Sequence, residues 1–134
     1  MIGIVVVSHS SALAEAAREL ALQMLPSQAP AIELAAGTED GGLGTDASRV
    51  MEAVERAESG DGVLVLMDLG SAVMSAEMAV EMVDPAAAQT VRLSPAPLVE
   101  GLVVAAVTAA GGASLEQTAA EAEGGLQPKQ RHLG

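Results

Sequence analysis

Two short runs of apolar residues, at positions 2–7 (IGIVVV) and 63–67 (VLVLM), most constrain what this chain can fold into. Runs of this length without alternating polar residues are typical of strands that are covered on both faces. Each run is followed by a few polar residues and then by apolar residues at helical spacing. Because strands covered on both faces occur mainly in parallel sheets flanked by helices, the two runs predict an α/β fold.

Further strands and helices continue this alternation along the chain. Pro26 follows the first expected helix, and Thr45 or Asp46 can cap the second. We expect one domain over residues 1–123 and a flexible tail over residues 124–134. The fold predicted is an open, mainly parallel sheet of order 2-1-3-4 with helices on both faces. The remaining strands are expected at residues 31–35 and 90–93, and the helices at residues 11–24, 46–57, 72–82, 97–112 and 114–123.

Apolar stripes on the helices predict which faces are buried. We expect the apolar residues of the helix at 72–82 to pack in the core rather than to bind a soft metal, because no cysteine or histidine cluster accompanies them. The helix at 97–112 is apolar on nearly every face, so we expect cover on more than one side, for example by a second subunit. The stripes comprise Leu13, Ala17, Leu20, Ala21 and Met24 in the first helix, and Val73, Met74, Met78 and Met82 in the third.

Two polar residues follow neighbouring strands of the expected sheet. His9 comes after the first strand and Asp68 after the third, and the order 2-1-3-4 places these strands side by side. A glycine-rich loop after the second strand, residues 37–45, should approach the same edge. The sequence therefore predicts that His9, Asp68 and this loop meet at the switch point of the sheet.

This combination suits the chemistry of a nucleophilic histidine. A carboxylate that accepts a hydrogen bond from Nδ1–H fixes the imidazole tautomer, leaves Nε2 free to attack phosphorus, and stabilises the cation that forms. We therefore assign His9 and Asp68 as catalytic residues. Backbone N–H groups or hydroxyls at the starts of the flanking helices and in the loop are candidates to hold phosphoryl oxygens. These candidates are Ser10, Ser11, Gly44, Thr45, Gly70 and Ser71.

Plainer interpretations stay open for several of these residues. Ser8 and Ser11 can simply cap the first helix, and Asp68 can cap the third. The loop glycines can mark only a need for positive φ, and His9 can be an ordinary residue at a strand end. An aspartate-phosphorylated receiver domain is excluded, because it needs acidic Mg²⁺ ligands where this chain has Ser-His-Ser. A Walker-type nucleotide site is excluded, because the chain has no Gly-x-x-x-x-Gly-Lys-Ser/Thr motif.

Composition excludes further classes of function. The chain has no Phe, Tyr or Trp to stack on bases, and its formal charge of −12 repels a phosphate backbone, so we expect no binding to nucleic acid. It has no cysteine, which excludes disulfides and thiol chemistry. Its apolar stretches are shorter than the ~20 residues of a membrane span, and its start has no signal-peptide pattern. We expect a cytoplasmic protein without membrane contact.

Four segments in this order resemble the mannose-type enzyme IIA family of the bacterial phosphoenolpyruvate-dependent phosphotransferase system. They lie within residues 1–122 and read GIVVVSHS at 3–10, GGLGTD at 41–46, LMDLGSA at 66–72 and APLVEG at 96–101. Sugar-transporting members usually have Asp-Thr-x-Gly-Gly-Ser-Pro where this chain has DLGSA at 68–72. That departure favours the branch of the family that serves dihydroxyacetone kinase.

The resemblance implies a role for the chain and its partners. His9 matches the phosphorylated histidine of the family, and Asp68 matches the aspartate bound to it. The branch accepts phosphate from the carrier HPr and passes it to ADP on the nucleotide-binding subunit of dihydroxyacetone kinase. Its members are homodimers, and the resemblance implies no metal or nucleotide cofactor on this chain. The alternatives are a IIA component that feeds a sugar permease and a regulatory module of the same fold without turnover.

Overall fold

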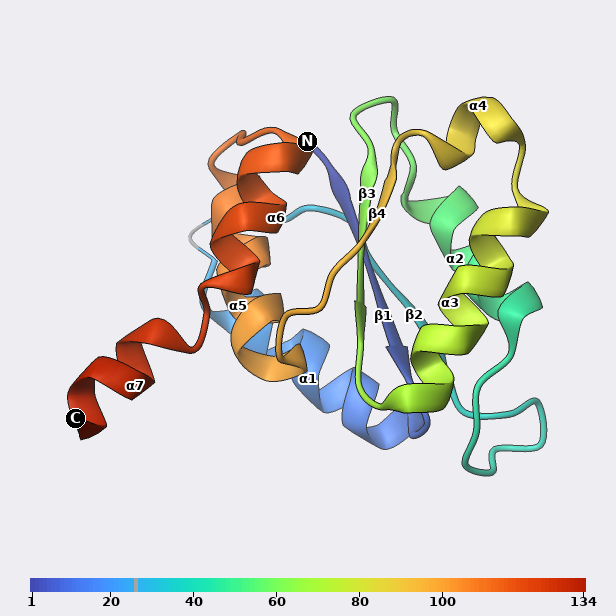
Figure 1. The fold of residues 1–134 in the computed structure, drawn as a ribbon, viewed down its shortest axis with the longest axis horizontal. Helices are drawn as coiled ribbons and strands as arrows, with labels where there is room; N and C mark the ends of the chain where they lie inside the picture. The colour runs from blue at the N-terminus through green and yellow to red at the C-terminus, as the bar shows by residue number, and fades with distance from the viewer. Residues whose placement is uncertain (26) are drawn as a thin grey trace.

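The computed structural model describes residues 1–25 and 27–134, which form a four-stranded sheet and seven helices (Figure 1). All strand pairs are parallel, and the order is β2-β1-β3-β4, so the predicted fold class is confirmed. The strands are β1 (Gly3–Ser8), β2 (Ile32–Ala36), β3 (Val63–Met67) and β4 (Val91–Leu93). The helices are α1 (Ser11–Gln23), α2 (Ala47–Ala57), α3 (Gly70–Met82), α4 (Pro85–Ala88), α5 (Leu98–Ala110), α6 (Leu115–Glu123) and α7 (Gln127–Leu133).

The sheet lies between two layers of helices. Figure 1 shows α1, α5 and α6 on one face and α2 and α3 on the other. Alternate residues of each strand point to opposite faces, so Ile4 and Val6 pack in one apolar cluster, and Val5 and Val7 in the other. The central strands are therefore buried on both sides, which explains why their sequences are continuously apolar.

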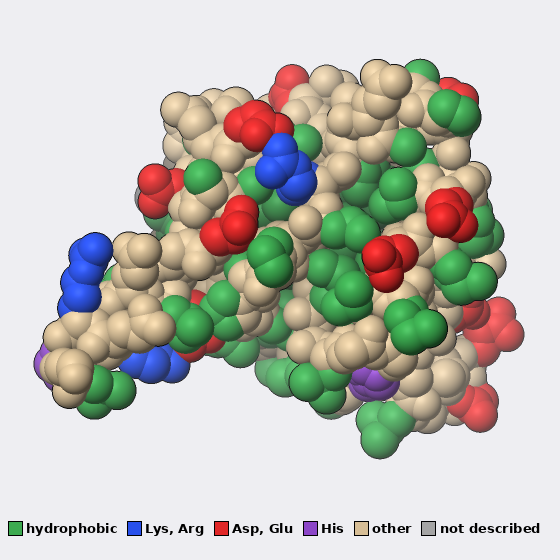
Figure 2. Space-filling view, in the orientation of Figure 1, with side chains coloured by type: hydrophobic (Ala, Val, Ile, Leu, Met, Phe, Trp, Pro, Cys, Tyr) green, Lys and Arg blue, Asp and Glu red, His purple; other side chains and the backbone are tan. Residues whose placement is uncertain are grey.

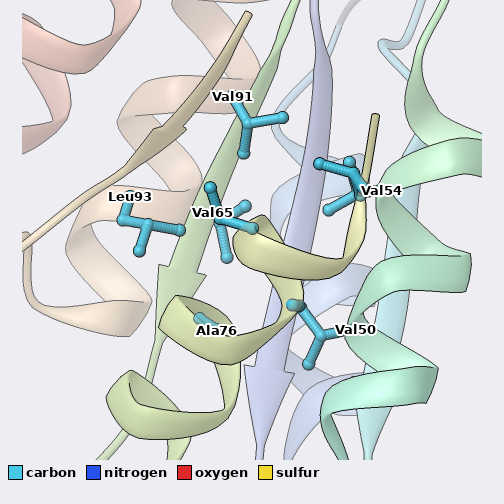
Figure 3. A pocket seen from close by; sticks show the side chains of 9 residues that line it. Val50, Val54, Val65, Ala76, Val91 and Leu93 are labelled. Carbon is cyan, nitrogen blue, oxygen red and sulfur yellow. The ribbon is translucent and has the colours of Figure 1, made fainter. Parts of the chain in front are cut away.

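The helices approach the sheet through small residues. The buried residues of α3 are all alanine, namely Ala72, Ala76 and Ala79. A Cβ atom added to Gly3 in β1 would lie 2.1 Å from the carbonyl oxygen of Ala57, so α2 depends on a glycine there. Figure 3 shows the apolar side chains that lie between α2, α3 and the sheet. The space between these side chains is too small for a water molecule. This region is packed core.

The prediction that the large apolar residues of α3 pack in the core is wrong. Val73, Met74, Met78 and Met82 are exposed, while the alanines of the same helix contact the sheet. Both sets of residues recur at helical spacing, and close packing on the sheet selects the smaller side chains. The stripe expected on α1 divides in the same way: Ala17 and Ala21 are buried, whereas the three larger residues are exposed. Those three residues are Leu13, Leu20 and Met24.

The C-terminal half of the chain departs in detail from the expectation. The interval between α3 and β4 contains the short helix α4, which the sequence pattern did not indicate. In α5 one face packs against the sheet and α6, while Val99 and Val107 are exposed on the other. Residues 124–134 include helix α7, where Lys129 is paired with Glu100. The flexibility of these residues stays a prediction, as does cover of α5 by a second subunit.

Pro26, expected just beyond the first helix, lies outside the described residues. Within residues 1–25 and 27–134, no helix combines the length and apolar character needed to cross a membrane.

Candidate functional site

The strand order brings His9 and Asp68 to one edge of the sheet. His9 directly follows β1, and Asp68 directly follows β3. These strands are adjacent and parallel, with Val7 opposite Met67, so both residues leave the sheet at the same level. The chain then continues into helices on opposite faces, which makes this edge the switch point of the sheet (Figure 1).

One carboxylate oxygen of Asp68 forms a hydrogen bond with the imidazole of His9. Oδ1 of Asp68 lies 2.9 Å from Nδ1 of His9 and also accepts the backbone N–H of Leu69 at 2.6 Å. Oδ2 accepts the backbone N–H of His9 and the hydroxyl of Ser8, each at 2.9 Å. The Asp68 side chain is only 9% exposed, whereas that of His9 is 28% exposed. The carboxylate is thus enclosed, and the imidazole remains accessible from solvent.

The same contacts set the charge state of Asp68. Burial alone would raise the pKa of this carboxyl, but hydrogen bonds from the backbone and ring of His9, and from Leu69 and Ser8, outweigh it. The net result is a pKa below the ordinary value for aspartate. Asp68 is therefore ionised at neutral pH and acts as an acceptor for Nδ1–H, and in the neutral imidazole tautomer that this contact favours, Nε2 carries no proton.

A hydroxyl group covers Nε2 of His9, the nitrogen that was predicted to be free. Oγ of Ser71, in the first turn of α3, forms a hydrogen bond with Nε2 of His9. With the proton on Nδ1, the hydroxyl is the donor and Nε2 the acceptor. Ser71 therefore lies beside the atom predicted to react, and its side chain must rotate before Nε2 can attack phosphorus.

The serines around His9 have different roles from those expected. Ser8 is fully buried and caps no helix; it donates to Asp68, and its Oγ accepts the N–H of Ser10 at 3.1 Å. Ser10 is the N-cap of α1, because its Oγ accepts the N–H of Leu13. Ser11 donates to the carbonyl of Ala36, at the end of β2. The capping interpretation of Ser8 and Ser11 is therefore wrong.

The role of Ser8 had no distinct signal in the sequence. A serine at the end of a buried strand fits a helix cap and a ligand of a neighbouring carboxylate equally well. Only the pairing of β1 with β3 brings Ser8 to Asp68.

The glycine-rich loop supports His9 through its backbone. The N–H of Gly44 donates to the carbonyl of His9 at 2.9 Å, and Gly44 has a φ of 145°. Oγ1 of Thr45 lies 2.6 Å from Oγ of Ser75 and 3.4 Å from the carbonyl of Ser71. Thr45 thus links the loop to α3 and forms no hydrogen bond with the imidazole, as far as the described residues show. Asp46, one of the two expected caps, caps α2.

The start of α3 offers hydrogen-bond donors beside the imidazole. Its N-cap is Leu69, and among the described residues no side chain caps this helix. The first helical hydrogen bond runs from Ala72 to Leu69. The N–H groups of Gly70 and Ser71 precede it, so they are available to an anion.

Acidic residues do not gather into a metal site. In the part of the chain that the structure describes, no group of three or more His, Cys, Asp or Glu side chains is arranged to hold a metal ion. The site therefore consists of an imidazole, a carboxylate, hydroxyls and backbone N–H groups.

An open parallel sheet of order 2-1-3-4, with its polar site at the switch point, defines a flavodoxin-like α/β domain. Residues 3–119 match the sequence model of the family described as "PTS system fructose IIA component", and the chain belongs to this family. The resemblance to the mannose-type enzyme IIA family is thereby confirmed.

Curated relatives with similar names align with most or all of this chain. A protein of Escherichia coli (strain K12), named "PEP-dependent dihydroxyacetone kinase, phosphoryl donor subunit DhaM", is 48% identical over 136 residues. That match covers 100% of this chain and 29% of the relative, so the chain spans less than a third of its length. A Listeria innocua protein, "PEP-dependent dihydroxyacetone kinase 2, phosphoryl donor subunit DhaM", is 36% identical over 107 residues, which cover 80% of this chain and 85% of the relative.

A solved structure has the same fold. The crystal structure of a protein of unknown function superposes on this chain with a TM-score of 0.82 at 38% identity. The superposition covers 90% of this chain and 91% of that protein. It supports the arrangement of strands and helices and assigns no activity.

Proposed function

We propose that this chain is a phosphoryl carrier that accepts phosphate from HPr on His9. It passes the phosphate to ADP bound on the nucleotide-binding subunit of dihydroxyacetone kinase. The observation that carries the proposal is the hydrogen bond between Nδ1 of His9 and the enclosed carboxylate of Asp68, at the exposed switch point of a family member. The names of the relatives, which are phosphoryl donor subunits, support the choice of acceptor.

Each transfer exchanges one bond to phosphorus for another. Nε2 of His9 attacks the phosphorus of phospho-HPr, the N–P bond in the donor breaks, and a new Nε2–P bond forms. The ring keeps its proton on Nδ1 and becomes cationic, a charge that the ionised Asp68 stabilises. A phosphate oxygen of ADP then attacks the same phosphorus, and the neutral imidazole is released. In-line positioning of the two partners supplies most of the rate.

The groups around Nε2 are suited to receive the phosphoryl oxygens. The hydroxyl of Ser71 rotates from Nε2 to a phosphoryl oxygen, and the N–H groups of Gly70 and Ser71 donate to the same group. At the start of α1, Ser11 contributes its backbone N–H group, because its hydroxyl donates to Ala36. Ser10 contributes its hydroxyl proton, because its backbone N–H donates to Ser8 and its Oγ only accepts a hydrogen bond, from Leu13. Gly44 and Thr45 act indirectly, by holding His9 and α3 in place.

The chemistry requires no cofactor on this chain. Attack by a neutral imidazole on a phosphohistidine needs no metal to generate the nucleophile, because Asp68 fixes the tautomer. We propose that ADP and ATP remain on the partner kinase subunit.

A second function within the family remains a candidate. The matching family description names a fructose IIA component, which favours a chain that feeds a sugar permease. The same phosphohistidine would form, but the acceptor would be a permease component instead of ADP on a kinase.

We further propose that two copies of the chain associate through the outer face of α5. Residues 101–113 contain no charged residue, although the chain carries a formal charge of −12. Val99 and Val107 are exposed on this face, with Val103 partly buried between them. An uncharged apolar face is the surface through which two acidic copies repel each other least. Val107→Glu should give monomers in sedimentation velocity, whereas Val73→Glu, the same change on α3, should not.

The proposed carrier activity is tested by following phosphate on the intact chain. With enzyme I, HPr and phosphoenolpyruvate, intact mass should show the addition of one phosphoryl group. His9→Ala should prevent it, and His132→Ala, which removes the only other histidine, should not. An unmodified parent chain would overturn the proposal. Adding the dihydroxyacetone kinase subunits with ADP should then discharge the phosphate, and discharge only to a permease component would favour the second function.

A further inference from the structure

The outer face of α3 carries large apolar side chains that are exposed to solvent. The exposed fraction is 67% for Met74 and 60% for Met78, and Val73 is also exposed on this helix. Figure 2 shows hydrophobic side chains gathered over α3. Clustered exposed apolar side chains mark interaction sites more often than isolated ones do.

This apolar surface is continuous with the phosphoryl site. α3 begins two residues after Asp68, and its first turn carries Ser71, which binds the imidazole. Leu69, at the start of the helix, is 68% exposed. At a rise of 1.5 Å per residue, Met82 lies about 16 Å along the helix from Ser71. A small phosphate donor would not reach so far, whereas a protein that docks at His9 would cover this length.

A hollow beside α3 enlarges the surface. Its volume is about 420 Å³, and it extends from Asp68 along the side of α3 that faces β4. Val73 and Glu77 form its α3 wall, and Leu93 and Pro95 form part of the opposite wall. The α3 surface is therefore contoured, with a recess that can receive apolar side chains of a partner.

The charge of this region indicates the chemistry of the partner. Helix α3 contains two acidic residues, Glu77 and Glu81, and no Lys or Arg, and both acidic residues lie among its exposed apolar residues. In Figure 2, among the residues drawn in colour, red side chains interrupt the hydrophobic area over α3, and no blue side chain does. A second copy with the same acidic face would be repelled, whereas a basic surface would be attracted.

We propose that the outer face of α3 is the docking surface for the protein that delivers the phosphoryl group to His9. The inference rests on the proposed function. The docking surface comprises Leu69, Val73, Met74, Glu77, Met78 and Glu81. The partner presents apolar side chains flanked by Lys or Arg, which enter the recess beside Val73 and approach Glu77 and Glu81. Methionine suits such a contact because its flexible, polarisable side chain adapts to the surface it meets.

The test separates docking from chemistry by comparing two phosphate donors. Phospho-HPr must dock on the chain, whereas phosphoramidate is small enough to reach His9 alone. For the double variant Met74→Ser/Met78→Ser, we expect kcat/KM with phospho-HPr to fall at least about tenfold, equivalent to about 1.4 kcal/mol. The rate with phosphoramidate should be unchanged. Met24→Ser, which alters an exposed methionine at the C-cap of α1, should behave as the parent with both donors.

The charges are tested by the dependence on salt. The parent rate with phospho-HPr should fall as ionic strength rises, and Glu77→Lys/Glu81→Lys should be slower and less sensitive to salt. Parent-like transfer from phospho-HPr to the double serine variant would overturn the docking proposal while leaving the proposed function intact. A parent chain that neither donor phosphorylates would overturn both. A change from dimer to monomer in the serine variant would assign α3 to self-association and overturn the proposal.

Discussion

Replacing Asp68 with asparagine tests the tautomer argument most directly, because the structure limits how the amide can be placed. Oδ1 of Asp68 accepts the backbone N–H of Leu69, and Oδ2 accepts the backbone N–H of His9. In either orientation, therefore, the NH₂ group of an asparagine faces a backbone donor. Leaving such a donor unpaired in an enclosed site costs about 1–3 kcal/mol, which is the loss of stability expected for the variant.

Both orientations of the asparagine also impair the reaction. With NH₂ at the Oδ1 position, it donates to Nδ1 of His9, so the ring proton moves to Nε2 and blocks the nucleophile. With NH₂ at the Oδ2 position, Nδ1–H keeps an acceptor, but the carboxylate charge that stabilises the cationic ring is lost. We expect phosphorylation of His9 by phosphoramidate to slow by about 10²–10⁴. Single-turnover time courses by intact mass measure this rate, and urea unfolding measures the stability.

A matched substitution controls for the change in charge. Asp46→Asn removes one negative charge near the same edge of the sheet, and asparagine caps a helix as well as aspartate does. This variant should be phosphorylated at the parent rate. A rate for Asp68→Asn within about twofold of the parent, with the expected loss of stability, would refute the assignment of Asp68 as the group that fixes the tautomer.

Three further substitutions test contacts that stabilise the fold. Ser8→Ala leaves the N–H of Ser10 unpaired and should lower the free energy of unfolding by about 1–3 kcal/mol in urea. Gly3→Ala places a Cβ against α2 and should lower the free energy of unfolding by about 1–3 kcal/mol in the same assay. Burial raises the pKa of Glu58, but hydrogen bonds from Gly60, Gly62, Thr90 and Ser59 lower it overall. Its stabilisation is therefore present above about pH 4.3 and lost as pH falls through its lower folded pKa. Glu58→Gln should be less stable than the parent at neutral pH, and urea titrations should show the difference shrinking below about pH 4.

The fold and the proximity of His9 to Asp68 could be predicted from the sequence, because both follow from general rules for parallel α/β sheets. Continuous apolar runs identify the buried strands, and the order of a parallel α/β sheet determines which strand ends lie together. That was sufficient to bring His9 and Asp68 to the same edge. Prediction of the chemical roles rested on the resemblance to a family and on the properties of imidazole.

The hydroxyl contacts could not be predicted, because they depend on local geometry. Ser8, Ser10 and Ser11 are near neighbours in the sequence, yet each binds a different element: Ser8 binds Asp68, Ser10 caps α1, and Ser11 bonds to the end of β2. Serine is a preferred residue at a helix N-cap, so residue type alone does not distinguish the three. Which serine caps the helix follows from where β1 ends, and element boundaries are the least certain part of a sequence prediction.

The exposed methionines show why apolar spacing alone does not identify a core. In α3, alanines and larger apolar residues both recur at helical spacing, so two arcs of the helix compete for the sheet. The alanine arc allows the closer approach, and the larger residues are left in solvent. Such a surface favours association, but two copies of a chain with a charge of −12 repel each other wherever acidic groups accompany the apolar ones. Acidic residues on α3 would therefore exclude a second copy and admit a basic partner, whereas the uncharged face of α5 would admit a second copy. On this argument, the distribution of charge over the apolar surfaces supports the proposal that they bind different partners.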